Sequence, residues 1–458
     1  MSGTTQAGPD GRWLIKGARP LGGEPADILI DHGAIAEVTP AGQSRGPARV
    51  LDADGLVMLP GLVDLHTHLR EPGREDAETV ASGTAAAALG GYTAVHAMAN
   101  TDPVADTAGV VEQVWRLGRQ AGHCDVRPVG AVTSGLGGAQ LAELGAMADS
   151  AARVRVFSDD GLCVADATIM RRALEYVKAF DGVIAQHAQE PRLTKGAQVN
   201  EGEISARLGL TGWPAVAEEA IIARDCLLAA HVGSALHVCH VSTAGSVEIV
   251  RWAKSKGWRV TAEVTPHHLL LTDDLAAGYD PVYKVNPPLR TAADVAALRA
   301  GLADGTIDCV ATDHAPHPVE SKETEWSQAS FGMTGLETAL RVVHEAMVST
   351  GLLDWAGVAD RMSVRPAAIG RLDAGWPPAG RAGGAAGDQP DLRHGTAIAA
   401  GYPANLVLYD PAPVQSVDPA EHASRSRNSP FAGMKLPGRV VATFLRGRPT
   451  VLDGRLAP

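Results

Sequence analysis

Lysine is scarce in this sequence of 458 residues. Only eight of its 40 basic residues are lysines, at positions 16, 178, 195, 254, 256, 284, 322 and 435, so residues 17–177 contain none. Acidic residues number 52, which gives a formal net charge of -12. Proteins that bind nucleic acid neutralise its phosphates with a basic surface. This charge balance therefore argues against a nucleic-acid partner.

Cysteine pairs and long apolar runs are also lacking. The five cysteines, at 124, 163, 226, 239 and 309, form no CxxC motif and are odd in number, which favours buried thiols in a reducing cytoplasm. The N-terminal stretch has neither the basic nor the apolar region of a signal peptide. The longest uncharged stretch, 79–101, contains glycines and polar residues, so it predicts a helix, a turn and a strand rather than a membrane span. We expect a cytoplasmic protein without a membrane partner.

Short apolar runs alternate with longer amphipathic segments through most of the chain. The predicted strands are 61–65, 92–98, 126–132, 153–157, 183–187, 235–240, 259–264 and 307–311. The helical patterns that follow them are 76–90, 106–122, 138–148, 166–179, 216–231, 243–256, 291–303 and 334–349. Eight such units predict an α/β fold, a (β/α)8 barrel of the TIM type. We assign residues 59–373 to this barrel.

The two flanks of the predicted barrel have a different pattern. Residues 1–58 and 396–458 contain short β-like pieces joined by glycine and aspartate turns. Neither flank has enough apolar residues for a core of its own, so we expect them to pair as one composite β-sandwich domain. Residues 374–395 are rich in glycine, proline and alanine, which predicts a flexible loop.

Histidines and aspartates follow several of the predicted strands. The first strand runs into His66 and His68, and alternation along an extended chain places both imidazoles on the same side. His187 closes the fifth strand and His240 the sixth, Asp159 and Asp160 follow the fourth, and Asp313 follows the eighth. Functional groups of such barrels gather at the carboxyl ends of the strands, and imidazoles with carboxylates suit Zn²⁺. A single HxH pair is common by chance, but all these placements together predict a metal centre.

Longer motifs carry a resemblance to a known family. They are DLHTHLREPG (64–73), GGYTAVHAMANTDP (90–103), FSDDG (157–161), HVCHVST (237–243), VTAEVTPHHLLL (260–271), YKVNPPLR (283–290), ATDHAPH (311–317) and SFGMTGLET (330–338). The set resembles the class I dihydroorotases of the amidohydrolase superfamily. The resemblance covers nearly the whole predicted barrel and both flanks.

The resemblance implies a site with two zinc ions per chain. The metal ligands would be His66, His68, Asp160, His187, His240 and Asp313, with Asp313 also the catalytic acid and base. The substrate-binding residues would be His68, Arg70, Asn100, Asn286, His317, Phe331 and Gly332. The long polar segment 314–331 is predicted to be a mobile loop that closes on the substrate.

The missing lysines bear on the group that bridges the two metals. Many members of the superfamily use a carboxylated lysine at the end of the fourth strand. No lysine stands anywhere from residue 17 to 177, and Lys178 lies in the helix before the fifth strand. A carboxylate must therefore take this place. The family match favours Asp160, and Asp159 remains the alternative.

The activity implied by the resemblance is the reversible cyclisation of N-carbamoyl-L-aspartate to L-dihydroorotate in the de novo synthesis of pyrimidines (UMP). A zinc-activated hydroxide would attack the ring carbonyl, with Asp313 transferring the proton. One alternative is a cyclic amidohydrolase of the hydantoinase or allantoinase kind. Another is an inactive homologue that stabilises aspartate transcarbamoylase. Besides the small-molecule substrate, possible partners are a second copy of the chain and aspartate transcarbamoylase.

Overall fold

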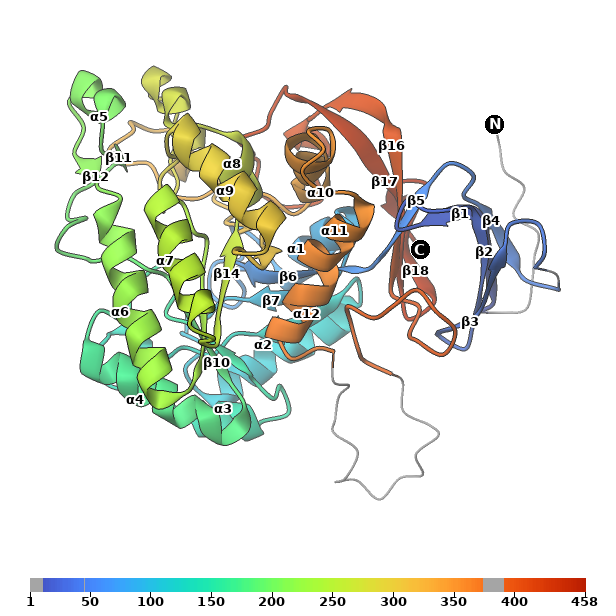
Figure 1. Cartoon of the computed structure of the whole chain (residues 1–458), viewed down its shortest axis with the longest axis horizontal. Coiled ribbons are helices and arrows are strands. Elements are labelled where there is room, and N and C mark those ends of the chain that lie inside the picture. The colour runs from blue at the N-terminus through green and yellow to red at the C-terminus, as the bar shows by residue number, and fades with distance from the viewer. Residues whose placement is uncertain (1–10, 45, 374–390) are drawn as a thin grey trace.

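A computed structural model describes residues 11–44, 46–373 and 391–458 of the chain (Figure 1). The predicted flexible loop at 374–395 lies outside the described residues except for its last five positions. All five cysteines are free thiols, and four of them are buried. Within the described ranges, no helix combines the length and the apolar character needed to cross a membrane.

Eight short parallel strands form the centre of the larger part of the molecule. They are β6 (Leu62–Thr67), β7 (Tyr92–Ala97), β8 (Asp125–Pro128), β9 (Val156–Phe157), β10 (Val183–Gln186), β13 (Ala235–Val238), β14 (Val260–Val264) and β15 (Cys309–Val310). The first three pair in one sheet and the other five in a second sheet. Parallel bridges from Gly130 to Phe157 and from Thr67 to His314 connect the edges of the two sheets. The strands therefore follow one another in a ring, and the predicted parallel α/β architecture is confirmed.

Helices pack on the outside of this ring (Figure 1). Those that correspond to predicted segments are α1 (Val80–Leu89), α2 (Ala108–Ala121), α3 (Leu144–Asp149), α4 (Ala167–Val177), α6 (Val216–Val232), α7 (Ala244–Ser255), α9 (Ala292–Asp304) and α10 (Ala339–Val343). Side chains cap several of their starts: Asp166 accepts hydrogen bonds from the N–H groups of Thr168 and Ile169 at α4, and Thr291 with Asp294 forms a capping box at α9. These helices match the predicted segments to within a few residues at most ends.

The sequence pattern does not predict the shorter elements of this part. They are α5 (Glu203–Leu208), α8 (Pro266–Leu270), α11 (Trp355–Ala359), α12 (Arg365–Ile369) and the strands β11 (Val199–Asn200) and β12 (Gly212–Trp213). Each spans too few residues for an apolar period to show.

Strands from both chain ends form a separate mixed sheet, which we call the terminal sheet. They are β1 (Trp13–Pro20), β2 (Ala26–Asp31), β3 (Ala34–Pro40), β4 (Arg49–Asp52), β5 (Val57–Pro60), β16 (Leu406–Ser416), β17 (Lys435–Leu445), β18 (Arg448–Leu452) and β19 (Arg455–Leu456). The N-terminal strand β5 pairs antiparallel with the C-terminal strand β16. The Trp13 ring packs edge-on against Phe444, with 5.5 Å between the ring centroids. The two flanks therefore share one apolar core.

An ionic contact joins the terminal sheet to the strand ring. Asp125, the first residue of β8, accepts hydrogen bonds of 2.6 and 3.0 Å from Arg446, which follows β17. Its Oδ2 also lies 2.8 Å from Nε2 of the buried His394. Burial favours the neutral acid, but His394 and Arg446 outweigh this effect and hold the pKa of Asp125 far below its usual value. Asp125 is therefore a charged anchor between the two parts.

We expect Asp125→Asn to destabilise the protein. The change leaves the Arg446 guanidinium without its carboxylate in a mostly buried contact, which costs about 2 kcal/mol or more. Thermal unfolding followed by fluorescence should show a Tm lowered by a few degrees. Asp54→Asn is the matched control, because Asp54 is exposed. Equal Tm values for the two variants would show that the anchor contributes nothing.

Candidate metal centre

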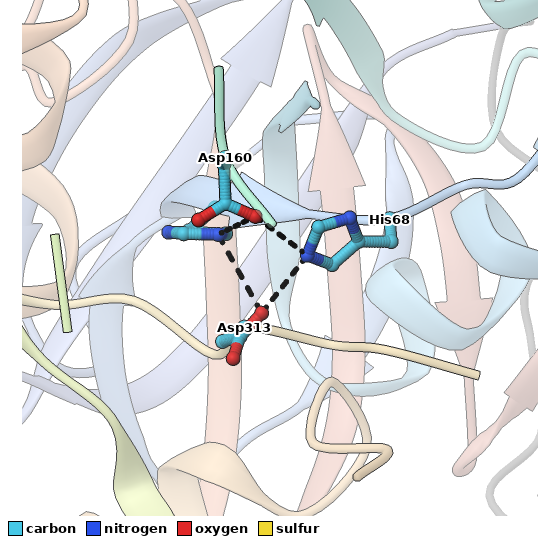
Figure 2. Close-up of side chains that lie close together, drawn as sticks. His68, Asp160 and Asp313 are labelled. Carbon is cyan, nitrogen blue, oxygen red and sulfur yellow. Dashed lines mark hydrogen bonds and ion pairs between the residues drawn. The ribbon is translucent and has the colours of Figure 1, made fainter. Parts of the chain in front are cut away.

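Six predicted ligands come together at the carboxyl ends of the ring strands. We call them the His–Asp cluster: His66, His68, Asp160, His187, His240 and Asp313, which end or follow β6, β9, β10, β13 and β15. Figure 2 shows His68, Asp160 and Asp313 pointing toward one another. All six side chains are buried. Residues separated by up to 247 positions in the sequence therefore form one compact group.

Asp160 lies between two pairs of histidines. Its Oδ2 is 3.2 Å from His66 Nε2 and 3.3 Å from His68 Nε2. Its Oδ1 is 3.3 Å from both His187 Nδ1 and His240 Nε2. The nitrogens of this second pair are only 2.9 Å apart. Each carboxylate oxygen thus faces one pair of imidazoles, which is the arrangement required of a group that bridges two ions.

Asp313 lies on one side of the cluster only. Its Oδ1 is 3.0 Å from His68 Nε2 and 3.5 Å from His66 Nε2. Its Oδ2 has no hydrogen bond or ion pair among the described residues. One carboxylate oxygen can therefore join the first histidine pair while the other stays available to a ligand.

Asp159, the alternative to Asp160, faces away from the cluster. Its carboxylate accepts hydrogen bonds from the backbone N–H groups of Val132 and Thr133 at 2.8 and 2.9 Å, and from the Thr133 hydroxyl. It therefore holds the segment after β8 against the segment after β9.

Three residues at the site have backbone conformations that are rare without glycine. The φ angles of Arg70, His240 and Asp313 are 62°, 32° and 47°. Such conformations cost about 1–3 kcal/mol each and persist only where the surrounding structure enforces them. The fold here accepts local strain in order to aim these three side chains.

The charges of the cluster favour a cation. Burial opposes a charge on His66, but Asp160, Asp313 and Glu263 outweigh it and raise the pKa of His66 well above its usual value. His66 Nε2 is buried and forms no hydrogen bond within the described ranges, although it lies 3.2 Å from Asp160 Oδ2. A nitrogen whose lone pair faces a metal has this environment. The imidazole and carboxylate donors, in two sets that share Asp160, fit divalent metal ions such as zinc.

Glu263, the fourth of the five residues of β14, contacts the His–Asp cluster. It was not predicted as a site residue. Its carboxylate lies 2.7 Å from His66 Nδ1 and 3.0 Å from His237 Nε2, and it accepts a weaker bond from the backbone N–H of His240. The contact with Nδ1 leaves Nε2 of His66 to face Asp160, a common arrangement around metal ligands. The sequence signal is an acidic residue inside the apolar strand 260–264.

Two predicted substrate residues, Asn100 and Asn286, are linked to the His–Asp cluster, one directly and the other through Gln189. Asn100 Oδ1 lies 2.9 Å from His68 Nδ1. Asn286 donates a 3.1 Å hydrogen bond to Gln189 Oε1, which is also 2.7 Å from His187 Nε2. Gln189 was not predicted, although its position two residues after a ligand fits the alternation of an extended chain. The Asn286 Oδ1 atom is buried without a partner, so it remains available to a ligand.

The other predicted substrate residues form a wall beside the cluster, which we call the anion wall: Arg70, His317, Phe331 and Gly332. Arg70 is buried and donates from Nε to the carbonyl of Pro316 at 3.1 Å, and no carboxylate of the described residues forms an ion pair with it. Burial and the charge of Arg74 lower its pKa only to about 10, so it stays charged. His317 donates from Nε2 to the Phe331 carbonyl at 2.7 Å. Burial and Arg70 lower the pKa of His317 to about 2, so its ring is neutral.

Comparison with solved structures places the fold among cyclic amidohydrolases. The L-hydantoinase (dihydropyrimidinase) of Arthrobacter aurescens has a TM-score of 0.83 and 26% sequence identity, over 97% of each chain. A dihydropyrimidinase of Brevibacillus agri has a TM-score of 0.79 over 97% of this chain and 96% of that one, at 22% identity, which is evidence of the fold alone.

Sequence comparison narrows the family. A family model described as "Dihydro-orotase-like" matches residues 55–246. A Streptomyces coelicolor protein named dihydroorotase is 68% identical over 443 residues, which are 97% of this chain and 99% of that protein. A dihydroorotase of Mycobacterium tuberculosis is 56% identical over 97% of this chain and 99% of its own length. The chain therefore belongs to the dihydroorotase family, as its motifs predict.

Paired substitutions of the two adjacent aspartates test the metal centre. Asp160→Asn should lower the bound zinc to less than half of the wild-type content, because the amide carries no negative charge and keeps only one of the two oxygens, so one set loses its shared ligand oxygen. Asp159→Asn should keep the zinc content and lower Tm instead. Zinc is measured by atomic emission after dialysis, and Tm by thermal unfolding. A full zinc content in Asp160→Asn would contradict the bridging geometry.

Proposed function

We propose that this chain is a dizinc dihydroorotase, which interconverts N-carbamoyl-L-aspartate and L-dihydroorotate in pyrimidine biosynthesis. The observation that carries the proposal is Arg70, a buried guanidinium next to the His–Asp cluster that forms no ion pair with any carboxylate of the described residues. A buried charge without a partner is costly, and a carboxylate on the substrate would neutralise it. Both proposed substrates carry such a carboxylate.

The fold and the partners complete the proposal. The strand ring with its helices would be a (β/α)8 barrel over residues 59–373, with a β-sandwich built from 1–58 and 396–458. The buried free thiols favour the cytoplasm as the place of action. A second copy of the chain and aspartate transcarbamoylase remain possible partners.

The metal ions would be held by the two halves of the cluster. His66, His68 and Asp313 would bind one zinc, His187 and His240 the other, and Asp160 both. Two zinc ions in this place supply a Lewis acid and lower the pKa of a bound water. Glu263 and Asn100 fix the orientation of the imidazole rings that bind them.

Asp313 would move the proton. Its Oδ1 is engaged with His66 and His68, whereas its Oδ2 is free. In the ring-opening direction Oδ2 takes a proton from the attacking water and gives it to the amide nitrogen as the ring C–N bond breaks. Cyclisation uses the same atom in reverse. Arg70 would hold the substrate carboxylate through its free N–H groups and so aim the carbonyl at the cluster.

A hydantoinase is the second candidate, because a hydantoinase shares the fold at a TM-score of 0.83. Its substrate ring does not require a carboxylate, so Arg70 would have no role there. Assays of the purified protein on L-dihydroorotate, hydantoin and allantoin separate the two. We expect turnover of dihydroorotate at least 100-fold faster than of the others, and the reverse preference would refute the proposal. An inactive homologue should have lost ligands, and this chain retains all six.

Asp313→Asn tests the proton transfer. The amide keeps the size of the side chain but cannot accept a proton, and general acid–base catalysis of this kind contributes about 10²–10⁴-fold. We expect kcat to fall by a factor of about 10² or more, while Tm stays within a few degrees of the wild-type value. Activity within tenfold of wild type would exclude Asp313 as the acid and base.

Arg70→Met tests recognition of the carboxylate. A lost charge-assisted hydrogen bond costs about 2 kcal/mol, or roughly 30-fold in kcat/KM for dihydroorotate. Arg74→Met is the control, since Arg74 is exposed on the same loop and should retain the wild-type kcat/KM. An equal loss in both variants would point to the loop rather than to the guanidinium of Arg70.

A further inference from the structure

Two of the eight lysines, Lys284 and Lys322, are buried near the anion wall without a carboxylate. Their exposed fractions are 1% and 7%, and neither forms an ion pair among the described residues. Lysine is among the residues that are almost never fully buried unless paired. Burial and the charge of Lys284 lower the pKa of Lys322 to about 7, and burial lowers that of Lys284 to about 8. A cation kept in so costly a place calls for an explanation.

Backbone carbonyls, rather than carboxylates, accept the hydrogen bonds of both lysines. Lys322 Nζ donates to the carbonyls of Ser330, Gly332 and Lys284 at 2.8, 3.0 and 3.1 Å, which uses all three of its N–H groups. Lys284 Nζ donates to the carbonyl of Trp326 at 2.6 Å and lies 4.5 Å from the centroid of the Phe331 ring. Both ammonium groups therefore bind the segment 326–332, which ends in Phe331 and Gly332 of the anion wall.

That segment leaves little freedom to Phe331 and Gly332. The Gly332 N–H donates to the carbonyl of Lys284 at 3.0 Å, and the Phe331 carbonyl accepts the proton of His317 Nε2. Gly332 has a φ of 140°, and a Cβ there would come within 2.7 Å of His317 Nε2. Only a glycine fits so close to the imidazole. The position of the wall thus depends on where these carbonyls are held.

Space is available next to Lys322 and His317. A cavity of about 230 Å³ is lined by His317, Val319 and Lys322 among other residues. Without Lys322, the carbonyls of Ser330 and Gly332 would each lose a hydrogen bond, and His317 would have room to move into this cavity. Such a shift would misplace groups that bind the substrate away from the reacting atoms, which lowers affinity, because a preorganised binding site avoids the cost of ordering on binding.

We propose that Lys322 is a positioning residue for the substrate: its ammonium group gathers the carbonyls of Ser330, Gly332 and Lys284 and so fixes the Phe331–Gly332 peptide and His317 in the anion wall. Lys284 reinforces the same segment through Trp326 and the Phe331 ring. The substrate named here rests on the proposed dihydroorotase activity. The positioning itself does not require that activity.

Lys322→Met tests the proposal, because methionine keeps much of the length and removes every donor. We expect the KM for L-dihydroorotate to rise at least tenfold, with kcat within threefold and zinc content unchanged. Hydrogen exchange of a peptide spanning 318–332 should become faster, while peptides of β6 and β7 keep their wild-type rates. Lys178→Met is the matched control, since Lys178 also donates to one carbonyl, that of Val232, but is exposed. It should match the wild type in all measurements.

Each further outcome decides the question. Wild-type KM and wild-type exchange in Lys322→Met would overturn the proposal. A raised KM with unchanged exchange would also overturn it, because the lysine would then act through its charge alone. If Lys322→Met does not fold, Lys322→Gln decides by the same criteria. If the wild-type enzyme does not turn over dihydroorotate, the proposed function fails, but the exchange of 318–332 still decides the role of Lys322.

Discussion

The carboxylate of Asp160 is the contact on which the arrangement of the site depends. Its two oxygens each face a pair of imidazoles, at 3.2–3.3 Å from the four nitrogens. This geometry requires β6, β9, β10 and β13 to keep their relative positions to within a few tenths of an ångström. A ring of parallel strands provides such rigidity, because each strand is hydrogen-bonded to two neighbours. The same requirement explains why the backbone tolerates positive φ angles at His240 and Asp313.

The ring and its helices could be predicted from the sequence because their apolar patterns are long and regular. The sequence also predicts that the residues of the His–Asp cluster gather at one end of the ring, since each ends or follows a predicted strand, whereas their roles as ligands were predicted from the family resemblance. The choice between Asp159 and Asp160 could not be made from the residues alone. Successive side chains of an extended chain point to opposite sides, so a shift of one residue exchanges the two roles. Only the three-dimensional register of β9 shows that Asp159 binds the backbone at Val132 and Thr133.

Contacts between side chains and the backbone have no comparable signal in the sequence. Lys284 and Lys322 are unremarkable in the sequence, because their acceptors are main-chain carbonyls that any residue could provide. Glu263 offered a clearer signal, since a carboxylate in an apolar strand needs buried partners. The four-residue strand β4 is a similar case, because its place follows from its pairing with β1.

The distribution of positive charge reconciles the acidic composition with the anionic substrate proposed above. The net charge of -12 acts over distances that salt screens, because the Debye length is about 8 Å at physiological ionic strength. In and beside the anion wall, Arg70, Lys284 and Lys322 are buried, and none of them forms an ion pair with a carboxylate in the part of the chain that the structure describes. Buried charges are screened much less than exposed ones. The lysines therefore bear on the site in two ways: residues 17–177 contain none, and it is an aspartate, Asp160, that lies between the two histidine pairs, while two of the remaining lysines, Lys284 and Lys322, donate to backbone carbonyls beside the anion wall.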